Sequence, residues 1–304
     1  MTTKERVLSQ DKVGKLTDIN QFIKDGDSVA VGGAWLSSHP MALVRQIIRS
    51  GTKNLHVMTI LGSVDIDMLI GAGCVERLMF SFVSMEAFGL PPNFRRAIEK
   101  GDLKYDEISG LAIIIGFEAT GRGVPFLPYR GPFGSDYLKQ RPDFYKQITC
   151  PFTGEELTAV PAIKPDVAII HAQRADAAGN IQIEGTAGSD LELAKAARRV
   201  IVSVEEIVPT DVIRENPFKT KIPRIYVDLV IEQPFGAHPT SLVPAYVGDP
   251  WHMMTYMEMA AKPESFTDYL DRYVMKSEEE YMDALGGARH LDVLKKLAGE
   301  VKIL

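Results

Sequence analysis

The sequence predicts an α/β fold, with an open, mostly parallel sheet flanked by helices. Short apolar runs typical of buried strands alternate with segments whose apolar residues recur at helical spacing. The connections between them are short, which indicates βαβ units and therefore parallel strands. The chain has 304 residues, of which 45% are hydrophobic, so it can bury a sizeable core without disulfides. We expect one domain over residues 1–304.

The first part of the chain supplies strands and helices in alternation. Apolar positions in KLTDINQFIK, residues 15–24, predict a helix, and SVAVGG, residues 28–33, predicts a buried strand. Ser38-His39-Pro40 opens a second helix, because proline suits a first helical turn. The same reasoning predicts strands over 55–61 and 77–83, and helices over 65–71, 91–101 and from about Gly110.

The middle of the chain changes character. Residues 129–163 are rich in Gly and Pro and contain no long periodic run, which predicts a loop-rich excursion with one hairpin. Strands are then expected over 166–173, 200–204 and 224–231, with a helix over 190–198. From Trp251 to the end of the chain, residues 251–304, we expect a helical segment that includes a capped helix starting near Ser277.

Composition narrows the classes of function. The chain has 34 Lys and Arg against 40 Asp and Glu, and no block of like charge, so neither nucleic acid nor an anionic membrane is an expected partner. Cys74 and Cys150 are too few for a disulfide framework, and no His, Asp or Glu pair has metal-binding spacing on one helix. We expect no metal and no permanently bound cofactor. The first twenty residues lack the apolar core of a signal peptide, which predicts a cytoplasmic protein.

A glycine pair stands between the first predicted strand and the following helix. Gly32 and Gly33 let the backbone approach a ligand closely, and a helix start directs free N–H groups to the same place. Such a turn suits an oxyanion or a phosphate, and Ser37 and Ser38 follow in the same loop. The spacing matches neither glycine-rich nucleotide motif, and a purely structural turn is an equal alternative. His39 is more simply a cap or surface residue than a base.

Other polar residues are weaker candidates. Glu86 lies just beyond the third predicted strand, the usual position for ligand contacts in an open parallel sheet. Glu107 precedes the helix near Gly110, where a carboxylate suits acid–base or nucleophilic work. For both, a solvated or capping carboxylate is the commoner role. Arg130, in a Pro-rich loop, could bind a carboxylate or form a structural ion pair. His171 lies in an apolar strand, which favours a core histidine.

Several segments resemble the A subunit of family I CoA-transferases, of the glutaconate CoA-transferase type. In chain order they are DGDSVAVGG, HPMALVRQIIRSG, DMLIGAG, GVPFLP, PFTGEELTAVPAIKPDVAIIHAQRADAAGNIQIEG, VSVEEIV and PFGAHPTSLVPAY, and they cover most of residues 16–250. The resemblance implies an open α/β sheet and an active site where an A and a B subunit meet. It also implies a heterodimer that doubles into a heterotetramer or a larger oligomer.

The resemblance further implies a reaction in which CoA moves from an acyl-CoA to a small carboxylic or dicarboxylic acid. The intermediate is a glutamyl-CoA thioester on a Ser-Glu-Asn-Gly-type segment of the B subunit, and this chain has no such segment. The CoA thioester is then a substrate. Gly32, Gly33 and the loop after them become candidates for binding the oxyanion or the acyl group, and Ser63, Ser84 and Arg130 become lining candidates.

Two alternatives stay open. DEISGLAI, residues 106–113, resembles the A subunit of a related ring-opening hydrolase, in which a glutamate at the position of Glu107 acts as base. Related decarboxylases also lack the partner's nucleophile. The other alternative is a non-catalytic acyl-CoA-binding subunit that uses the same glycine loop. A B chain that carries the glutamate segment favours transfer, and one without it directs attention to Glu107.

Overall fold

The protein is described by a computed structural model that covers residues 11–185 and 188–300. The two ends of the expected domain 1–304 lie outside the described residues; these are the first ten residues, on which the expectation about a signal peptide rests, and the last four residues of the helical segment. The main sheet confirms the predicted fold class: its strand order is β1-β15-β13-β11-β2-β3-β5-β7, and every neighbouring pair on this path is parallel. The bounds are β1 Val13–Gly14, β15 Leu229–Glu232, β13 Arg199–Ile207, β11 Val167–Ala175, β2 Ser28–Val31, β3 Leu55–Met58, β5 Val75–Phe80 and β7 Lys104–Glu107.

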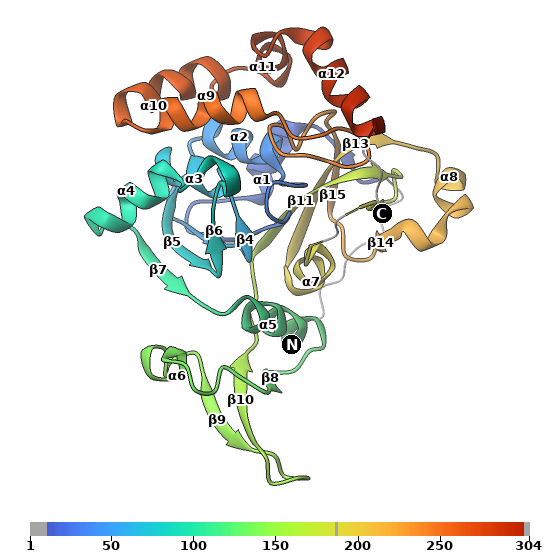
Figure 1. Ribbon diagram of the computed structural model, residues 1–304. Coiled ribbons are helices and arrows are strands. Elements are labelled where there is room, and N and C mark those ends of the chain that lie inside the picture. The colour runs from blue at the N-terminus through green and yellow to red at the C-terminus, as the bar shows by residue number, and fades with distance from the viewer. Residues whose placement is uncertain (1–10, 186–187, 301–304) are drawn as a thin grey trace.

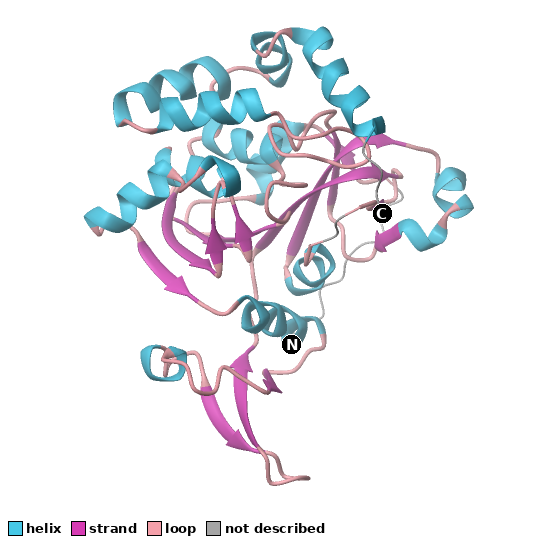
Figure 2. Ribbon diagram, in the orientation of Figure 1, coloured by secondary structure: helices cyan, strands magenta, loops and turns pink. Residues whose placement is uncertain are grey.

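Helices cover both faces of this sheet (Figures 1 and 2). Alternate residues of one strand face opposite layers: Val29 and Val31 of β2 lie in one apolar cluster and Ala30 lies in the other. The first cluster joins the sheet to α2 (Met41–Arg49), α3 (Val64–Gly71) and α9 (Pro250–Ala260). The second joins it to α5 (Gly110–Gly121) and α7 (Asp190–Ala196). The sheet therefore has no solvated face in its centre, as parallel sheets require.

The middle of the chain is more regular than the sequence predicts. Strands β8 (Phe126–Tyr129), β10 (Glu156–Pro161) and β9 (Lys146–Thr149) form a three-stranded antiparallel sheet, and a short helix, α6 (Tyr137–Gln140), precedes β9. Figure 1 shows this small sheet projecting from the body beyond α5. The predicted hairpin is present as β9 and β10, whereas β8, which pairs with β10 about thirty residues later, was not predicted because local composition does not reveal such a pairing.

The C-terminal segment is helical, as predicted. It contains α9, α10 (Pro263–Tyr269), a five-residue π-helical turn, α11 (Glu278–Ala284) and α12 (Gly287–Glu300). The predicted cap is confirmed: Ser277 Oγ accepts the N–H of Glu280, whose carboxylate accepts the N–H of Ser277. In Figure 1 these helices lie over the layer that contains α2 and α3.

Three predicted elements differ from the structure. The helix over 15–24 is a 3₁₀ turn, Leu16–Asp18, followed by the short α1 (Ile19–Phe22). The strand over 224–231 is only β15, because residues 224–227 turn through i→i+3 hydrogen bonds after Pro223. The strand over 77–83 is divided into β5 and β6 (Phe82–Val83), and β4 (Leu61–Gly62) pairs with β6.

The edge strand β7, which carries Glu107, was not predicted. The remaining elements are α4 (Pro92–Lys100), β12 (Ile181–Gln182), α8 (Thr210–Glu215), β14 (Thr220–Ile222) and the 3₁₀ turns Glu86–Phe88 and Pro217–Lys219. Among the described residues, none of the helices is both long enough and apolar enough to cross a bilayer.

Candidate functional site

The strand order reverses at β2. Going along the chain from β2, the next strands β3, β5 and β7 are added on one side, while β11, β13 and β15 lie on the other. In open parallel sheets, ligands bind beyond the carboxyl ends of the strands at such a reversal, because the connections there diverge and leave a crevice. Gly32 and Gly33 directly follow β2. The topology therefore places the predicted glycine turn at the preferred position for a ligand.

The glycine turn is tightly packed. Gly33 has a φ of +90°, and a Cβ there would lie 2.8 Å from the backbone nitrogen of His39. A Cβ on Gly32 would collide with Asp190 Oδ1. Both backbone N–H groups are already used: Gly32 donates to the Ile169 carbonyl at 2.9 Å, and Gly33 donates to Asp190 Oδ1 at 3.1 Å. The glycines give the turn its shape, but their N–H groups are not free to bind an oxyanion.

A two-residue hairpin follows the glycines. Ala34 and Ser37 exchange backbone hydrogen bonds of 2.9 and 3.0 Å, which leaves Trp35 and Leu36 at the tip. The N–H groups of Trp35 and Leu36 donate to no acceptor among the described residues. Trp35 has a φ of +59°, an unfavourable conformation for a side chain of this size, and the residue is 51% exposed. Backbone strain of this kind is concentrated at functional sites.

His39 is neither a cap nor a surface residue, so that expectation was wrong. Its side chain is fully buried, with Nδ1 2.9 Å from Asp65 Oδ2 and Nε2 2.7 Å from the Trp35 carbonyl. Burial alone would lower the pKa of His39, but the Asp65 carboxylate and the carbonyl bond raise it above the usual value. His39 therefore acts as a charged brace that connects the hairpin to α3.

Asp190 is a site residue that the sequence analysis missed. It is the first residue of α7, it is 2% exposed, and its carboxylate holds the Gly33 N–H. Burial raises the pKa of this carboxyl to about 6, against the lowering effects of the Gly33 bond and of His39. Asp190, the two glycines and Ile114 of α5 border a cavity of about 90 Å³. The only available signal was Ser189-Asp190 at a predicted helix start, which is a common capping pattern.

The loop after β15 packs against the other side of the hairpin. Ser38 donates its N–H to the Ser241 carbonyl at 2.7 Å, and Ser241 returns an N–H to the Leu36 carbonyl at 2.9 Å. Leu36 and Ser241 border a largely apolar pocket of about 300 Å³, together with Phe88 and Met253. Ser37 Oγ lies 3.3 Å from Ser38 Oγ. Ser37 and Ser38 therefore tie the hairpin to residues about 200 positions later in the sequence.

The other predicted lining residues lie on the next connections along the same edge. Ser63 is fully buried, and its N–H donates to Asp65 Oδ1 at 2.7 Å. Ser84 Oγ accepts the N–H of Glu86 at 2.9 Å, and Glu86 itself has a φ of +51°. Phe82, between these segments, contacts the Trp35 ring edge to face at 5.9 Å. The structure thus brings the Ser84–Glu86 segment next to the hairpin, with Glu86 on the exposed side.

Glu107 occupies a separate part of this edge. It ends β7, which is three strands away from β2 in the sheet, or about 14 Å at the usual strand spacing. Tyr137 Oη donates to Glu107 Oε1 at 3.4 Å, and both side chains border a pocket of about 490 Å³ that Arg141 also lines. Burial, followed by the negative charge of Glu107, raises the pKa of the Tyr137 hydroxyl.

The contacts of Arg130 and His171 indicate structural roles for both residues. Arg130 lies at the end of β8 in the small sheet, where its guanidinium binds Glu155 at 2.6 and 3.0 Å and remains 78% exposed. The ion-pair alternative therefore describes Arg130, and the structure does not bring it to the glycine turn. His171 is 1% exposed between Ser203 Oγ and Glu205, both at 2.8 Å, as expected for a core histidine.

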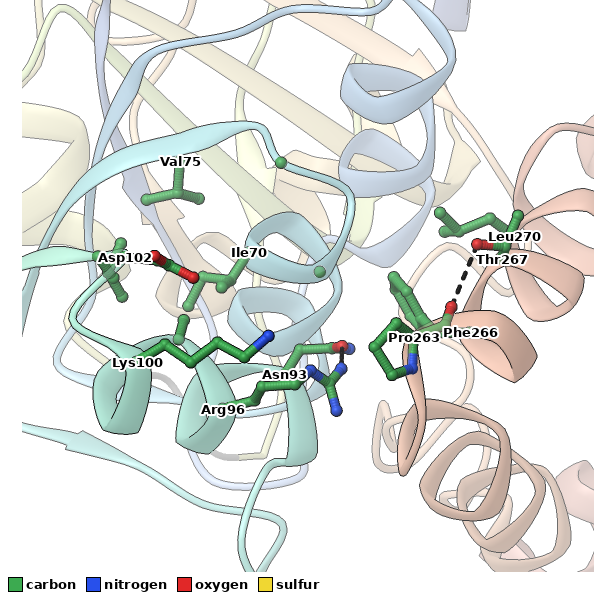
Figure 3. A pocket seen from close by; sticks show the side chains of 14 residues that line it. Ile70, Val75, Asn93, Arg96, Lys100, Asp102, Pro263, Phe266, Thr267 and Leu270 are labelled. Atoms are coloured by element: carbon green, nitrogen blue, oxygen red, sulfur yellow. Dashed lines mark hydrogen bonds between the residues drawn. The ribbon is translucent and has the colours of Figure 1, made fainter.

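A further pocket lies at the opposite edge of the sheet. Figure 3 shows this space of about 380 Å³ between α4 and α10, with Val75, the first residue of β5, in its wall. The guanidinium of Arg96, which lines it, is held by Asn93 Oδ1 and by the Ala261 carbonyl at 3.2 Å. The bond to Ala261 joins α4 to the residue that follows α9. The amino ends of the strands are not where a parallel sheet binds substrates.

Comparison with known proteins identifies the family. Residues 15–233 match the family model described as coenzyme A transferase, which is more than half of the chain. The chain belongs to the coenzyme A transferase family. The matched range contains the glycine turn, α3, β7 and Asp190, and it ends just after β15.

Individual relatives agree with this assignment. The chain is 33% identical over 301 residues to the A subunit of glutaconate CoA-transferase from Acidaminococcus fermentans, covering 93% of this chain and 94% of the relative. It is 38% identical over 259 residues to the A subunit of 3-oxoadipate CoA-transferase from Pseudomonas knackmussii, covering 84% and 90%. A protein of Archaeoglobus fulgidus is 40% identical over 299 residues; the match spans 97% of this chain but only 66% of that protein.

Solved structures share the fold. The crystal structure of glutaconate coenzyme A-transferase from Acidaminococcus fermentans superposes with a TM-score of 0.86 at 32% identity, covering 93% of this chain and 95% of that one. A variant of the decarboxylase AibA/AibB gives a TM-score of 0.77 at 31% identity, covering 86% and 99%. The cholesterol ring-cleaving hydrolase IpdA subunit of Rhodococcus jostii is 32% identical over 289 residues, covering 92% and 97%. Members of this fold group therefore carry names from three reaction classes.

Proposed function

We propose that this chain is the A subunit of a heteromeric CoA-transferase, which moves CoA from an acyl-CoA to a small carboxylic or dicarboxylic acid. The carrying observation is the strained hairpin at the strand reversal, whose tip N–H groups have no acceptor among the described residues. The names of the 3-oxoadipate and glutaconate CoA-transferase relatives support the reaction class and a dicarboxylic acid as the acyl group. The CoA thioester is a substrate, and no resident cofactor is needed.

The hairpin tip is the proposed oxyanion site. Each acyl transfer step passes through a tetrahedral oxyanion, and fixed N–H donors lower its energy. Because the N–H groups of Gly32 and Gly33 donate to acceptors inside the protein, we assign hydrogen-bond donation to the oxyanion to Trp35 and Leu36 instead. Gly33, Asp190 and His39 then hold the hairpin in place. Removing one oxyanion donor costs roughly 10²–10³ in kcat in other acyl-transfer enzymes.

The nucleophile is proposed to come from a second chain. This sequence has no Ser-Glu-Asn-Gly segment, and relatives are named as A subunits. Three large apolar side chains remain exposed along the carboxyl edge of the sheet: Trp35 at 51%, Phe82 at 41% and Leu111 at 56%. A B subunit seated there would cover them and bring its glutamate to the hairpin. We place the complete reaction in the cytoplasm, with residues 1–304 acting as one domain.

The test is reconstitution. The chain is purified alone and together with its B subunit, and each sample is given a panel of acyl-CoA donors and carboxylate acceptors. We expect exchange of CoA esters only with the pair, and a CoA thioester on the B subunit that mass spectrometry detects after incubation with acyl-CoA alone. CoA transfer by the isolated chain would contradict the proposal that the B subunit supplies the nucleophile. Binding of acyl-CoA by the pair without turnover would leave only the non-catalytic role.

A second candidate is acyl-CoA hydrolysis or decarboxylation that uses Glu107. The position of Glu107 favours it: the carboxylate ends a strand, lies in a pocket of about 490 Å³ and has Tyr137 as a hydrogen-bond partner. The cholesterol ring-cleaving hydrolase is similar in sequence, and the decarboxylase is similar in structure. This candidate requires a B chain without the glutamate segment. Release of free CoA or CO₂ without an acceptor acid would support it over transfer.

A further inference from the structure

Two histidines and one aspartate meet outside the site described above. His238 lies in the loop after β15, Asp249 caps α9, and His290 belongs to the first turn of α12. One ligand atom from each lies within 4.8 Å of the others. His238 and Asp249 are buried, with 0% and 1% of their side chains exposed, and His290 is 26% exposed. The three residues come from separate elements, so helix spacing in the sequence could not reveal the cluster.

The donor atoms of the cluster converge on one point. Asp249 Oδ2 lies 3.0 Å from His238 Nε2 and 2.6 Å from His290 Nε2. The other carboxylate oxygen, Oδ1, accepts the backbone N–H of His252 at 3.0 Å, which fixes the orientation of the group. Two imidazole nitrogens and one carboxylate oxygen form a ligand set typical of Zn²⁺, with bond lengths of about 2.0–2.2 Å. Small outward movements of the two rings would make room for the ion.

A second layer of contacts supports the ring that is deepest in the protein. The remaining nitrogen of His238, Nδ1, lies 2.7 Å from Tyr281 Oη. A tyrosine hydroxyl can donate or accept. When Nε2 carries its proton toward Asp249, Tyr281 donates to Nδ1; when Nε2 binds a metal, Nδ1–H donates to Tyr281. A partner of this kind, which orients a metal-bound histidine, is a regular feature of zinc sites.

We propose that His238, Asp249 and His290 bind one divalent transition-metal ion, with zinc as the best match to the ligand set. The partly exposed ring of His290 provides the entry path, and a water molecule completes a tetrahedral shell. The metal has no part in the proposed reaction. It would attach the C-terminal helices to the rest of the chain.

The consequence of metal binding follows from the connections of the three ligands. His238 and Asp249 bracket the loop that contains Ser241, which exchanges hydrogen bonds with Leu36 and Ser38 of the hairpin region. His290 lies on α12, which packs on the same loop through Leu291 and Leu294. A metal would therefore join α12 to the loop that supports the hairpin. It would stabilise the folded chain in proportion to the logarithm of the free metal concentration.

The test uses the full chain after removal of metals with a chelator. We expect isothermal titration calorimetry to show one equivalent of Zn²⁺ bound and the thermal midpoint to rise by several degrees. Co²⁺ should give the visible absorption of a tetrahedral site. His290→Ala, a change at a partly exposed position, should weaken Zn²⁺ binding by at least tenfold and remove most of the thermal shift. The matched control is His56→Ala, because the His56 side chain is 47% exposed on β3 and lies outside the cluster.

A second variant separates metal binding from a plain hydrogen-bond network. Tyr281→Phe keeps the ring and the three ligands but removes the hydroxyl, and we expect a tenfold to hundredfold loss in Zn²⁺ affinity. If wild type and His290→Ala bind Zn²⁺ equally weakly, or if the cobalt spectrum is octahedral and unchanged in His290→Ala, the cluster is only a hydrogen-bond network. Calorimetry on the chain without a partner keeps this result separate from any failure of the transferase proposal.

Discussion

His39 Nδ1 lies 2.9 Å from Asp65 Oδ2, and neither side chain is exposed. The second ring nitrogen faces the Trp35 carbonyl at 2.7 Å. Because both ring nitrogens meet acceptors, both carry protons, and the imidazole is charged in the folded state. This pair connects the start of α2 to the first turn of α3 and holds the strained tip of the hairpin between them.

The pair predicts a pH dependence of stability. Burial lowers the pKa of His39, but the Asp65 carboxylate and the bond to the Trp35 carbonyl together raise it by more. In the folded protein the pKa therefore lies above the usual 6.5. A raised histidine pKa contributes stability that is complete below about pH 6.5 and is lost as pH rises through the folded value. Asp65→Asn should cost about 3 kcal/mol near pH 6. We expect the urea-unfolding difference from wild type to shrink toward pH 9; a difference that stays constant with pH would contradict the charged brace.

Gly33→Ala tests the close packing of the turn. The new Cβ would lie 2.8 Å from the His39 nitrogen, in addition to the unfavourable φ of +90°. Gly26→Ala is the matched control, because Gly26 has a φ of +80° and nothing within 4 Å of the new atom. We expect a cost of about 1 kcal/mol for Gly26→Ala and about 1–3 kcal/mol more for Gly33→Ala. Transfer by the reconstituted pair should fall only in Gly33→Ala; equal losses in both variants would argue against a special role for the turn.

Asp190→Asn separates the shape of the Asp190 carboxylate from its charge. The amide oxygen can still accept the Gly33 N–H, while the buried charge is removed. Because the folded pKa, about 6, exceeds the unfolded value near 3.8, wild-type stability falls as pH rises between these values. Asp190→Asn should not show this fall in the free energy of unfolding, which amounts to up to about 3 kcal/mol in wild type. Denaturant titrations of both proteins from pH 4 to 7 measure the difference. Asp190→Ala also lacks the charge, so it should be less stable than Asp190→Asn by about 1–3 kcal/mol, because the Gly33 N–H loses its acceptor; equal stability of the two variants would refute the contact.

Glu278→Gln tests the attachment of the C-terminal helices. Arg45 is 1% exposed and binds Glu278 through two bonds of 3.0 and 2.6 Å, while its guanidinium lies 4.0 Å from the centre of the Tyr281 ring. Breaking a buried pair from one side leaves an uncompensated charge and costs about 3–5 kcal/mol. Glu99→Gln is the control, since the Arg95–Glu99 pair is exposed and should be worth less than about 0.5 kcal/mol. Similar thermal midpoints for the two variants would contradict this ranking.

Glu107→Gln distinguishes the two candidate reactions. In a transferase whose nucleophile is on the B subunit, the change should lower kcat only a few-fold, because Glu107 ends β7, three strands from β2, or about 14 Å at the usual strand spacing. In a hydrolase that uses Glu107 as base, it should lower kcat by roughly 10²–10⁴. Asp136→Asn is the control, an exposed carboxylate on the same pocket. Steady-state rates of the reconstituted pair measure both, and wild-type activity of Glu107→Gln in every assay would remove Glu107 from the site.

Local patterns in the sequence were sufficient for the strands and helices of the centre. The runs at β2, β11 and β13 place apolar residues on both faces, because a parallel sheet is covered on both sides, and such runs stand out in composition. The two glycines were found for a local reason as well: a strand that ends in a glycine pair before a proline-started helix predicts a turn. The resemblance added the reaction class and the need for a B subunit, which residue patterns could not supply.

Tertiary structure alone decided which groups work together. Asp190 reaches Gly33 across 157 positions of sequence, and Arg45 reaches Glu278 across 233, so no local window contains either pair. The same holds for β8 and β10 and for His238, Asp249 and His290. Whether an N–H is free or engaged also depends on the folded backbone, which is why the proposed donors moved from Gly32 and Gly33 to Trp35 and Leu36. Local propensity determines the elements, whereas long-range packing determines the partners of each polar group.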